Sequence, residues 1–385
     1  MKKKIAIVFN RMIVGGAEKA LSNFLKSINH SKYDIYLFTA VKDNPYIDEI
    51  PVYVRICDIS QCVPKERLIN DIKKLRISKA VSGLFCRALI RITNNNYKKH
   101  VYSHKANPLS DIYFDCVIAY KANYIDTSSA LYALKGKKKA TIVHGDLSDA
   151  SNVVSEFRPH IEKFDKVFCV SQSQLMRTNR IYPCLAKKTA VMLNAVDYEG
   201  IKALADDKIV YFSSSSIVTV GRLSPEKGQQ MIPATARLLL DAGYDIHWYL
   251  VGDGPLREEV EREIEKHGVA DNVILLGTQT NPYPYIKNCD IYVQPSFSEG
   301  YCTTTVEAKI FQKPIVTTDA PGMREQFVSG ENGLIVDAMT PGALYDGIKT
   351  LLDHPEIREK FVENLKNESF DNSREMQKLY DFIES

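Results

Sequence analysis

Short runs of β-branched and aromatic residues recur along the chain, and stretches with helical periodicity separate many of them. In the first half, strands are predicted at residues 4–10, 33–40, 114–120, 140–145 and 166–171. The first helical stretch, GAEKALSNFLKSI, occupies residues 16–28. Strands that alternate with helices are typical of a parallel sheet covered by helices on both faces.

The second half repeats this alternation more regularly. Strands are predicted at residues 216–221, 247–252, 272–277, 290–295, 313–318 and 332–337. Helices are predicted near residues 228–241, at 255–268 and from about residue 302. The order of the elements therefore predicts an α/β protein with two Rossmann-like domains.

A polar stretch that ends in a serine run, residues 197–216, separates the two halves. The 385 residues of the chain also exceed the ~100–200 residues of a usual single domain. We therefore predict an N-terminal domain at residues 1–200, a C-terminal domain at 201–368 and a terminal segment at 369–385.

The overall composition excludes few classes of ligand. Charged residues make up 25% of the chain and the net charge is only +3, so nothing in the total calls for nucleic acid as a partner. The apolar run after the first lysines ends at Asn10, which is too short for a signal peptide, and no window approaches the ~18 apolar residues of a membrane span. The eight cysteines form no CxxC pair and the histidines show no metal spacing. We expect reduced thiols, a cytoplasmic protein, and neither a metal nor another cofactor.

The segment at residues 65–105 departs from this near-neutral background. It holds eleven Lys or Arg against two acidic residues, so its local charge is +9 and the rest of the chain carries −6. Apolar residues interleave at roughly helical spacing, at Leu68, Ile72, Leu75, Leu84, Leu89 and Ile92. A basic amphipathic helix of this kind can lie on an anionic membrane, where each surface Lys or Arg contributes ~1 kcal/mol. The alternative is an ordinary solvated helix that covers the N-terminal core.

The segment PSFSEGYCTTTVEA, residues 295–308, carries two glutamates eight positions apart, Glu299 and Glu307. It follows a predicted strand and leads into a helix, so the free backbone N–H groups of residues 302–305 would point into the crevice at the strand's carboxyl end. Such N–H groups bind phosphate, and ligands of open α/β sheets bind in this crevice. A carboxylate at Glu307 would repel phosphate and suits a ribose diol, whereas Glu299 could accept hydrogen bonds from sugar hydroxyls.

Two further segments suggest a phosphate ligand. VGRLSPEKG, residues 220–228, follows a strand and places Arg222 and Lys227 five residues apart, where both could reach a diphosphate. Gly15 and Gly16 precede the first helix, where the backbone can approach an anion closely. The turn VGDGP at residues 251–255 is not a GxGxxG motif, which argues against a dinucleotide-dependent dehydrogenase.

Taken together, VGGAEKAL, GRLSPEKG, LVGDGP, SEGYCTTTVEA and KPIVTTDAPGMREQ resemble the retaining GT-B glycosyltransferases of family 4. The resemblance covers essentially the whole C-terminal half in the expected order, together with the N-terminal glycine loop. It implies a GT-B fold in which two Rossmann-like domains face a cleft and the terminal helix crosses back to the N-terminal domain. The family's usual E-G-F-G reads E-G-Y-C here, with Cys302 in place of a glycine, and this position bears on which donor sugar fits.

The resemblance also implies roles for individual residues. Arg222 and Lys227 would neutralise the diphosphate of a nucleotide-sugar, Glu307 would bind its ribose, and Glu299 would hold hydroxyls of the transferred sugar. The helix start at Cys302, Thr303 and Thr304 would contribute donor-binding N–H groups, and Gly15 and Gly16 would contact the phosphates. His144, in VHGD after a strand, matches the family's histidine near the transferred sugar; the alternative is a structural histidine at a strand end.

The function expected from these residues is a metal-independent, retaining hexosyltransferase. A UDP-sugar is the favoured donor and GDP-mannose stays open; the acceptor would be a lipid-linked or oligosaccharide chain in cell-surface polysaccharide synthesis. Two alternatives remain: another sugar-nucleotide enzyme with this architecture, such as a non-hydrolysing epimerase, and a non-catalytic GT-B partner subunit. The expected location is the cytoplasm, with peripheral contact to the inner face of the membrane through residues 65–105.

Overall fold

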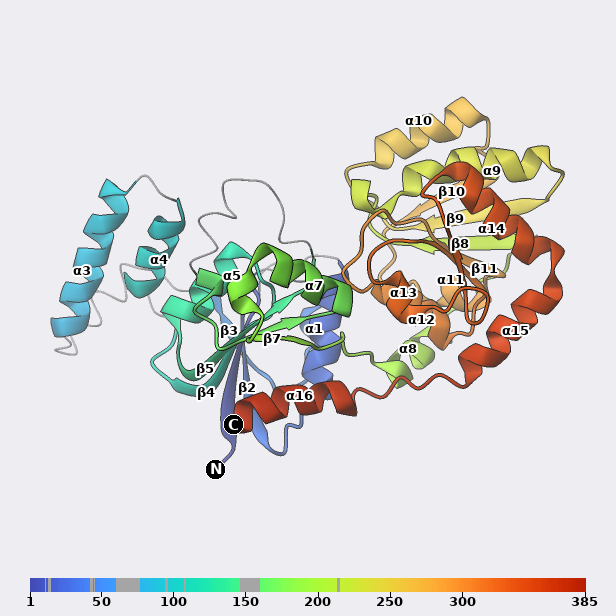
Figure 1. Cartoon of the computed structure of the whole chain (residues 1–385). Helices are drawn as coiled ribbons and strands as arrows, with labels where there is room; N and C mark the ends of the chain where they lie inside the picture. Colours follow the sequence, from blue (N-terminus) through green and yellow to red (C-terminus); the bar gives the residue numbers. More distant parts are fainter. Residues whose placement is uncertain are drawn as a thin grey trace. The chain divides into compact units, whose positions relative to one another are not determined.

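The computed structural model describes residues 1–10, 12, 15–41, 44, 46–59, 77–93, 96–106, 109–145, 160–212 and 215–385. The chain forms two compact units, each built on one sheet (Figure 1). The first unit comprises residues 1–195 and 372–385, and the second comprises residues 196–371. Relative to the predicted boundaries, the first division lies five residues earlier and the second lies three residues later.

The first unit contains a seven-stranded sheet in the order β3-β2-β1-β4-β5-β6-β7, with every pair parallel. The strands are β1 (Lys3–Val8), β2 (Tyr33–Thr39), β3 (Arg55–Asp58), β4 (Tyr113–Ala119), β5 (Lys135–Val143), β6 (Lys166–Cys169) and β7 (Thr189–Val191). The helices are α1 (Gly16–Ser27), α3 (Ile77–Ile92), α4 (Asn96–Ala106), α5 (Tyr124–Ser128), α7 (Gln172–Ile181) and α16 (Ser373–Glu384). A π-helical turn, Ser129–Ala133, follows α5.

The second unit contains a six-stranded parallel sheet in the order β10-β9-β8-β11-β12-β13. The strands are β8 (Ser215–Val220), β9 (Ile246–Val251), β10 (Val273–Gly277), β11 (Ile291–Gln294), β12 (Ile315–Thr318) and β13 (Leu334–Val336). The helices are α8 (Tyr198–Ala205), α9 (Ile232–Asp241), α10 (Arg257–His267), α11 (Tyr283–Asn288), α12 (Thr303–Ile310), α13 (Met323–Gln326), α14 (Pro341–Asp353) and α15 (Pro355–Lys366). The prediction of an α/β protein with two Rossmann-like units is confirmed.

The apolar runs form strands because both faces of each sheet are covered by helices. In β8, Ile217 packs into the core beneath α9, α10 and α14, whereas the next residue, Val218, packs into the core beneath α8, α11 and α12. Successive side chains of a strand point to opposite faces, so a strand buried on both faces must be apolar throughout. The short edge strand β3 was missed by the sequence pattern because its residues are half-buried or exposed.

The C-terminal helix α16 belongs to the first unit, where it packs beside β2 (Figure 1). The ring of Tyr380 stacks on that of Tyr33 with 5.2 Å between centroids, and the Tyr33 hydroxyl donates to Glu384 at 3.0 Å. At the start of the helix, the Glu375 carboxylate accepts a hydrogen bond of 2.8 Å from the backbone N–H of Leu193. Residues at both ends of α16 therefore fix it to the N-terminal sheet.

The described part of the basic segment holds two helices where one amphipathic helix was predicted, since α3 ends at Ile92 and α4 begins at Asn96. Helix α4 packs on α5 and the following π-helical turn, and α3 packs on α4 (Figure 1). Of the predicted apolar positions, Leu89 is half-buried and Ile92 is exposed. Several predicted positions lie outside the described residues: Lys65, Glu66, Arg67, Leu68, Asp71, Ile72, Lys73, Lys74, Leu75 and Arg76, and the side chains of Lys79, Leu84 and Arg87.

Candidate active site

The two segments expected to bind the donor meet at the carboxyl end of β11. The backbone N–H groups of Phe297 and Ser298 both donate to the carbonyl of Glu226, at 2.8 and 3.2 Å. Gly228 has a φ of +70°, and a Cβ at this position would lie 2.0 Å from the carbonyl oxygen of Pro295. Only glycine fits this close approach in the left-handed region. The turn that carries Lys227 is thereby packed against the loop that carries Glu299.

Lys227 and Glu299 form an ion pair at this junction. The Lys227 ammonium donates to both carboxylate oxygens of Glu299, at 2.7 and 2.9 Å. The side chains are only 22% and 7% exposed. Burial is the largest single effect and would lower the pKa of Lys227, but the electrostatic and hydrogen-bond contributions of its neighbours, chiefly Glu299, together outweigh burial and the pKa is raised. An ammonium has three N–H donors, and the described residues offer acceptors to two of those of Lys227, so one donor is left for a ligand.

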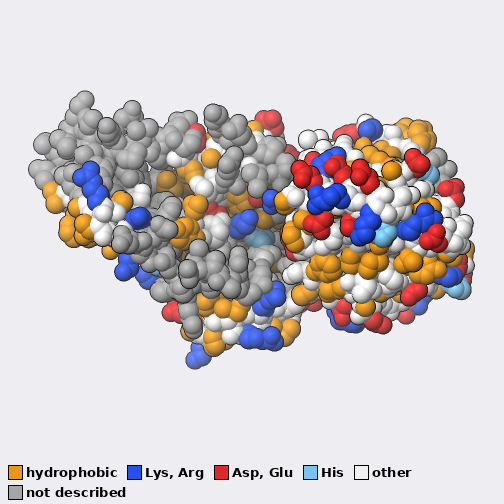
Figure 2. Space-filling model, turned by 90° about the horizontal axis from the view of Figure 1, so that it is seen from above, with side chains coloured by type: hydrophobic (Ala, Val, Ile, Leu, Met, Phe, Trp, Pro, Cys, Tyr) orange, Lys and Arg blue, Asp and Glu red, His pale blue; other side chains and the backbone are white. Residues whose placement is uncertain are grey.

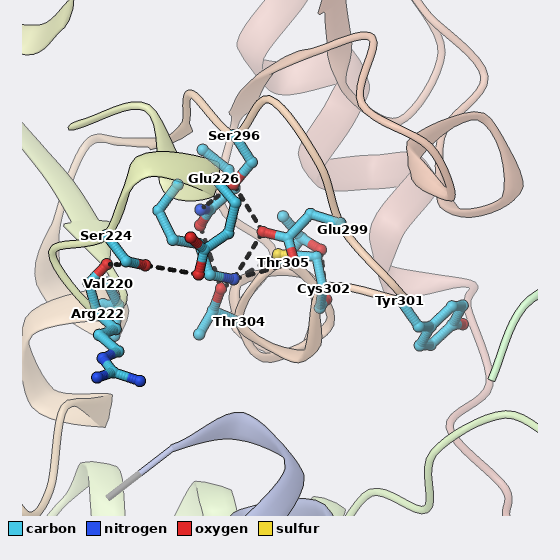
Figure 3. A network of polar contacts seen from close by, with 12 residues as sticks. Val220, Arg222, Ser224, Glu226, Ser296, Glu299, Tyr301, Cys302, Thr304 and Thr305 are labelled. Atoms are coloured by element: carbon cyan, nitrogen blue, oxygen red, sulfur yellow. Dashed lines mark hydrogen bonds and ion pairs between the residues drawn. The ribbon is translucent and has the colours of Figure 1, made fainter. Parts of the chain in front are cut away.

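A chain of buried hydrogen bonds holds the Glu299 carboxylate on the side of Ser296 (Figure 3). The Ser296 hydroxyl donates to Glu299 Oε1 at 2.6 Å, and Gln294 Nε2 donates to the Ser296 oxygen at 2.8 Å. Gln294 Oε1 in turn accepts from Tyr292 at 2.9 Å and from Thr304 at 3.1 Å. Gln294 therefore joins the carboxylate to the first turn of α12. Neither Ser296 nor Gln294 was predicted, although a glutamine within a buried strand is a signal that a hydrogen-bond network requires it.

Helix α12 begins at Thr303, one residue after the predicted start. Cys302 precedes the helix, and its thiol lies 3.4 Å from the Thr304 hydroxyl. Burial raises the pKa of the Cys302 thiol to about 11, so the thiol is neutral and adds no charge beside Lys227. The second turn of the helix carries Glu307, which is 7% exposed and accepts a long hydrogen bond of 3.5 Å from the Tyr283 hydroxyl.

Arg222 is close in sequence to Lys227 but lies apart from the ion pair. Its side chain is exposed, and its guanidinium makes no hydrogen bond or ion pair with any residue that the structure describes. Figure 3 shows this side chain pointing away from Glu299. Lys227 itself lies in a short 3₁₀ helix, Pro225–Lys227, and α9 begins only at Ile232. The helix predicted near residues 228–241 starts with the 3₁₀ turn Gln229–Met231 and continues as α9.

The remaining predicted residues lie in the first unit. The His144 ring follows β5 and donates from Nε2 to the carbonyl of Tyr120 at 2.9 Å. Burial, together with the charge of Lys121, lowers the pKa of His144 to about 4 against the opposing effect of this hydrogen bond. The ring is thus neutral at pH 7, and its Nδ1 is a buried acceptor with no hydrogen-bond partner among the described residues.

The glycine pair precedes α1 as predicted, with Gly15 at the N-cap and Gly16 as the first helical residue. A Cβ at Gly15 would lie 2.6 Å from a carboxylate oxygen of Glu18, which is 4% exposed. A carboxylate therefore occupies the start of α1 beside the glycines, where it is stabilised by the helix dipole. Glu18 was not predicted, although a glutamate three residues after the N-cap is a recognised capping signal.

The structure thus groups the predicted residues in two places. In the second unit it brings together Lys227, Glu299, Cys302 and Thr304. In the first unit, the His144 ring is hydrogen-bonded to the carbonyl of Tyr120, and Gly15 lies beside the carboxylate of Glu18. No helix among the described parts of the chain is long and apolar enough to cross a membrane.

Comparison with known proteins shows that the chain is similar to glycosyltransferases. Residues 209–368 match the family described as glycosyl transferases group 1. The chain is 24% identical over 378 residues to N-acetylgalactosamine-N,N'-diacetylbacillosaminyl-diphospho-undecaprenol 4-alpha-N-acetylgalactosaminyltransferase of Campylobacter jejuni, and the match covers 94% of each protein. It is 25% identical over 171 residues to the capsular polysaccharide biosynthesis glycosyltransferase CapM of Staphylococcus aureus, which covers 43% of this chain and 44% of CapM.

Among solved structures, the chain is similar to Anabaena Alr3699/HepE in complex with UDP and glucose. The TM-score is 0.72 with 18% sequence identity, and the match covers 100% of both chains. At this identity the similarity concerns the fold, and it includes both α/β units.

Proposed function

We propose that this chain, whose residues 209–368 match the glycosyl transferases group 1 family and whose fold is that of GT-B enzymes, transfers a hexose from a nucleotide-diphosphate sugar, preferably a UDP-sugar. The acceptor we propose is a lipid-linked or oligosaccharide chain in cell-surface polysaccharide synthesis. We also propose assignment to family 4, retention of anomeric configuration and independence of metal. One observation carries the proposal: Lys227, Glu299 and the first turn of α12 meet at the carboxyl end of β11, although Lys227 and Glu299 are 72 residues apart in the chain.

The geometry suits a diphosphate leaving group. When the bond between the anomeric carbon and the phosphate oxygen breaks, negative charge develops on the diphosphate. The remaining N–H donor of Lys227 and the backbone N–H groups at the start of α12 can stabilise that charge. Arg222 is exposed and not held by an ion pair among the described residues, so its side chain is free to turn toward the same ligand.

A front-face attack accounts for retention without a carboxylate nucleophile. The acceptor hydroxyl forms the new bond to the anomeric carbon, and its proton passes to the departing phosphate oxygen. Glu299 is hydrogen-bonded to Lys227 and Ser296, which favours a role in holding Lys227 and in accepting from sugar hydroxyls over a role as nucleophile. We propose that Glu307 accepts from the ribose and that neutral His144 accepts a hydrogen bond from the sugar or the acceptor through Nδ1.

The names of the relatives support the choice of substrates. The Anabaena protein was solved with UDP and glucose, and the Campylobacter enzyme is named for a diphospho-undecaprenol acceptor. We propose a cytoplasmic protein that works at the inner membrane face, where the activated sugar and a lipid-linked acceptor are both accessible.

A donor panel read by thermal stabilisation tests the proposal. A UDP-sugar should raise the unfolding temperature by mass action, and release of UDP from it should require an acceptor and persist with EDTA present. Stabilisation by no UDP- or GDP-sugar would leave a non-catalytic subunit as the better explanation. Nucleotide release without an acceptor would favour an epimerase.

Variants of the two cations test the site itself. Arg222→Ala and Lys227→Ala should each reduce turnover by about 10²-fold if each cation contributes ~3 kcal/mol to the transition state. Arg222→Ala is the cleaner variant, because its exposed side chain has no partner to leave unpaired among the described residues. Lys266→Ala, which removes an exposed cation on α10, serves as the control. Near-normal transfer by both site variants would contradict the assignment.

A further inference from the structure

Helix α3 carries an exposed apolar stripe on the side away from α4. Val81, Phe85 and Ile92 are 59%, 65% and 77% exposed, and Ala88 is exposed as well. The spacing 81, 85, 88 and 92 follows the period of an α-helix, so the four side chains lie on one face. This stripe is not the one predicted from the sequence, which included Leu89 and excluded Phe85.

The opposite side of α3 explains why the stripe faces outward. Cys86 is 6% exposed, and Leu89 and Ile90 are half-buried. Since α3 packs on α4, these residues form the covered face of the helix. The helix therefore has apolar residues on two faces, and among the described residues only the face toward α4 is covered.

The charge around the stripe is entirely positive within the two helices. Helices α3 and α4 together carry six Lys or Arg and no Asp or Glu. Arg91 on α3 is exposed, as are Lys98 and Lys105 on α4. Figure 2 shows hydrophobic side chains together with Lys and Arg at the end of the first unit where Figure 1 places α3.

We propose that this face of α3 is a docking surface for an anionic lipid bilayer. Val81, Phe85, Ala88 and Ile92 enter the boundary between headgroups and acyl chains, and the Lys and Arg side chains contact the anionic headgroups. The proposal rests on the proposed function only in that a lipid-linked acceptor would be presented at such a surface. The combination of charge and apolar residues selects this partner over two others.

A second copy of the chain would place two helix pairs of the same positive charge against each other, which is unfavourable. Nucleic acid would match the charge but would leave the exposed Phe85 and Ile92 without apolar contacts. An anionic bilayer offers negative charge to the Lys and Arg side chains and an apolar interior to Phe85 and Ile92, and one orientation of α3 allows both contacts.

Vesicle co-sedimentation of the full chain tests the proposal. The protein should bind vesicles of phosphatidylcholine with phosphatidylglycerol and bind neutral phosphatidylcholine vesicles much more weakly, with binding reduced by salt. Phe85→Ser with Ile92→Ser should weaken binding to the anionic vesicles by at least about tenfold. Arg91→Gln with Lys98→Gln should weaken it by about fivefold for each charge removed.

Val328→Ser is the matched control, because Val328 is an equally exposed apolar residue, at 66%, in the second unit. This variant should bind vesicles like the wild type. The proposal is overturned if the wild type does not bind anionic vesicles or if both α3 variants bind them as tightly as the wild type. It is also overturned if Val328→Ser weakens vesicle binding as much as the α3 variants do. A dimer in sedimentation velocity that Phe85→Ser with Ile92→Ser abolishes would overturn it as well.

Nucleotide-sugar stabilisation of the same variants separates this proposal from the proposed function. None of the proposed donor residues lies on α3, so the α3 variants should keep the full response to the donor and a normal unfolding temperature. Vesicle binding without any donor response would contradict the proposed function alone. A donor response without vesicle binding would contradict the docking surface alone.

Discussion

Replacing Lys227 with methionine should destabilise the second unit more than replacing Lys227 and Glu299 together. Loss of Lys227 leaves a carboxylate that is only 7% exposed without its counter-charge. Breaking a buried ion pair in this way costs about 3–5 kcal/mol, whereas removing both charges can be nearly neutral. The Ser296 hydroxyl still donates to Glu299 at 2.6 Å, so we expect the lower end, about 3 kcal/mol.

A double-mutant cycle with Lys227→Met and Glu299→Gln isolates the pair. Glu299→Gln alone should cost about 1.5–3 kcal/mol, since a neutral amide remains to accept from the ammonium. The double variant should be destabilised by less than the sum of the single variants, with a coupling energy of at least about 1.5 kcal/mol.

The chain supplies its own probe for this measurement. Trp248 is the single tryptophan, is 0% exposed and lies in the core of the second unit. Its fluorescence during urea unfolding therefore reports the unit that holds the ion pair. Ser22→Ala, in α1 of the first unit, should leave the tryptophan transition unchanged and serves as a control for effects outside the second unit.

The sign of the pH dependence follows from the raised pKa of Lys227. Because the folded-state pKa lies above the ordinary value of 10.5, the stabilising contribution is complete at neutral pH and is lost only as the pH rises through the folded-state pKa. A coupling energy below about 0.5 kcal/mol at pH 7 would be typical of an exposed pair and would refute the view that this pair is a buried structural element of the site.

Two further predictions concern buried residues, one in each unit. Burial raises the pKa of Asp126 to about 7, although the hydrogen bonds from Asn10 and Asn123 oppose this shift. Between about pH 4 and 7 the folded state therefore binds more protons than the unfolded state. The free energy of unfolding should fall by up to about 4 kcal/mol as the pH rises through that range. Asp126→Asn should remove this loss, which unfolding free energies at pH 5 and pH 8 would reveal, and equal pH slopes in both proteins would contradict the reasoning. Gly228→Ala should destabilise the second unit by at least about 2 kcal/mol, because the added Cβ meets the Pro295 carbonyl in a left-handed turn. Gly243→Ala, with a φ of +87° and nothing within 4 Å, measures the backbone cost alone, and an equal effect of the two substitutions would exclude the steric contribution.

The architecture of each unit could be predicted from the amino-acid sequence. The buried part of β1, residues 5–8, is apolar throughout because parallel strands are buried on both faces, and this pattern is visible without coordinates. Local signals also located the start of α12 to within one residue and singled out Glu299 and Lys227. These features follow from the period of the backbone and from the chemistry of neighbouring residues, which are local properties.

Which of these residues contact each other depends on packing between distant parts of the chain. Lys227 and Glu299 are paired because Gly228 lets one turn approach the carbonyl of Pro295, 67 residues further along the chain, and no local pattern reports that approach. Arg222 carries a positive charge, as Lys227 does, yet its side chain points away from Glu299 (Figure 3). The exposed stripe of α3 was likewise decided by packing, because α4 covers one of its two apolar faces and leaves Val81, Phe85 and Ile92 in solvent. The chemistry of each side chain can be read from the sequence, but contact between distant residues depends on how the sheets and helices bury their apolar faces.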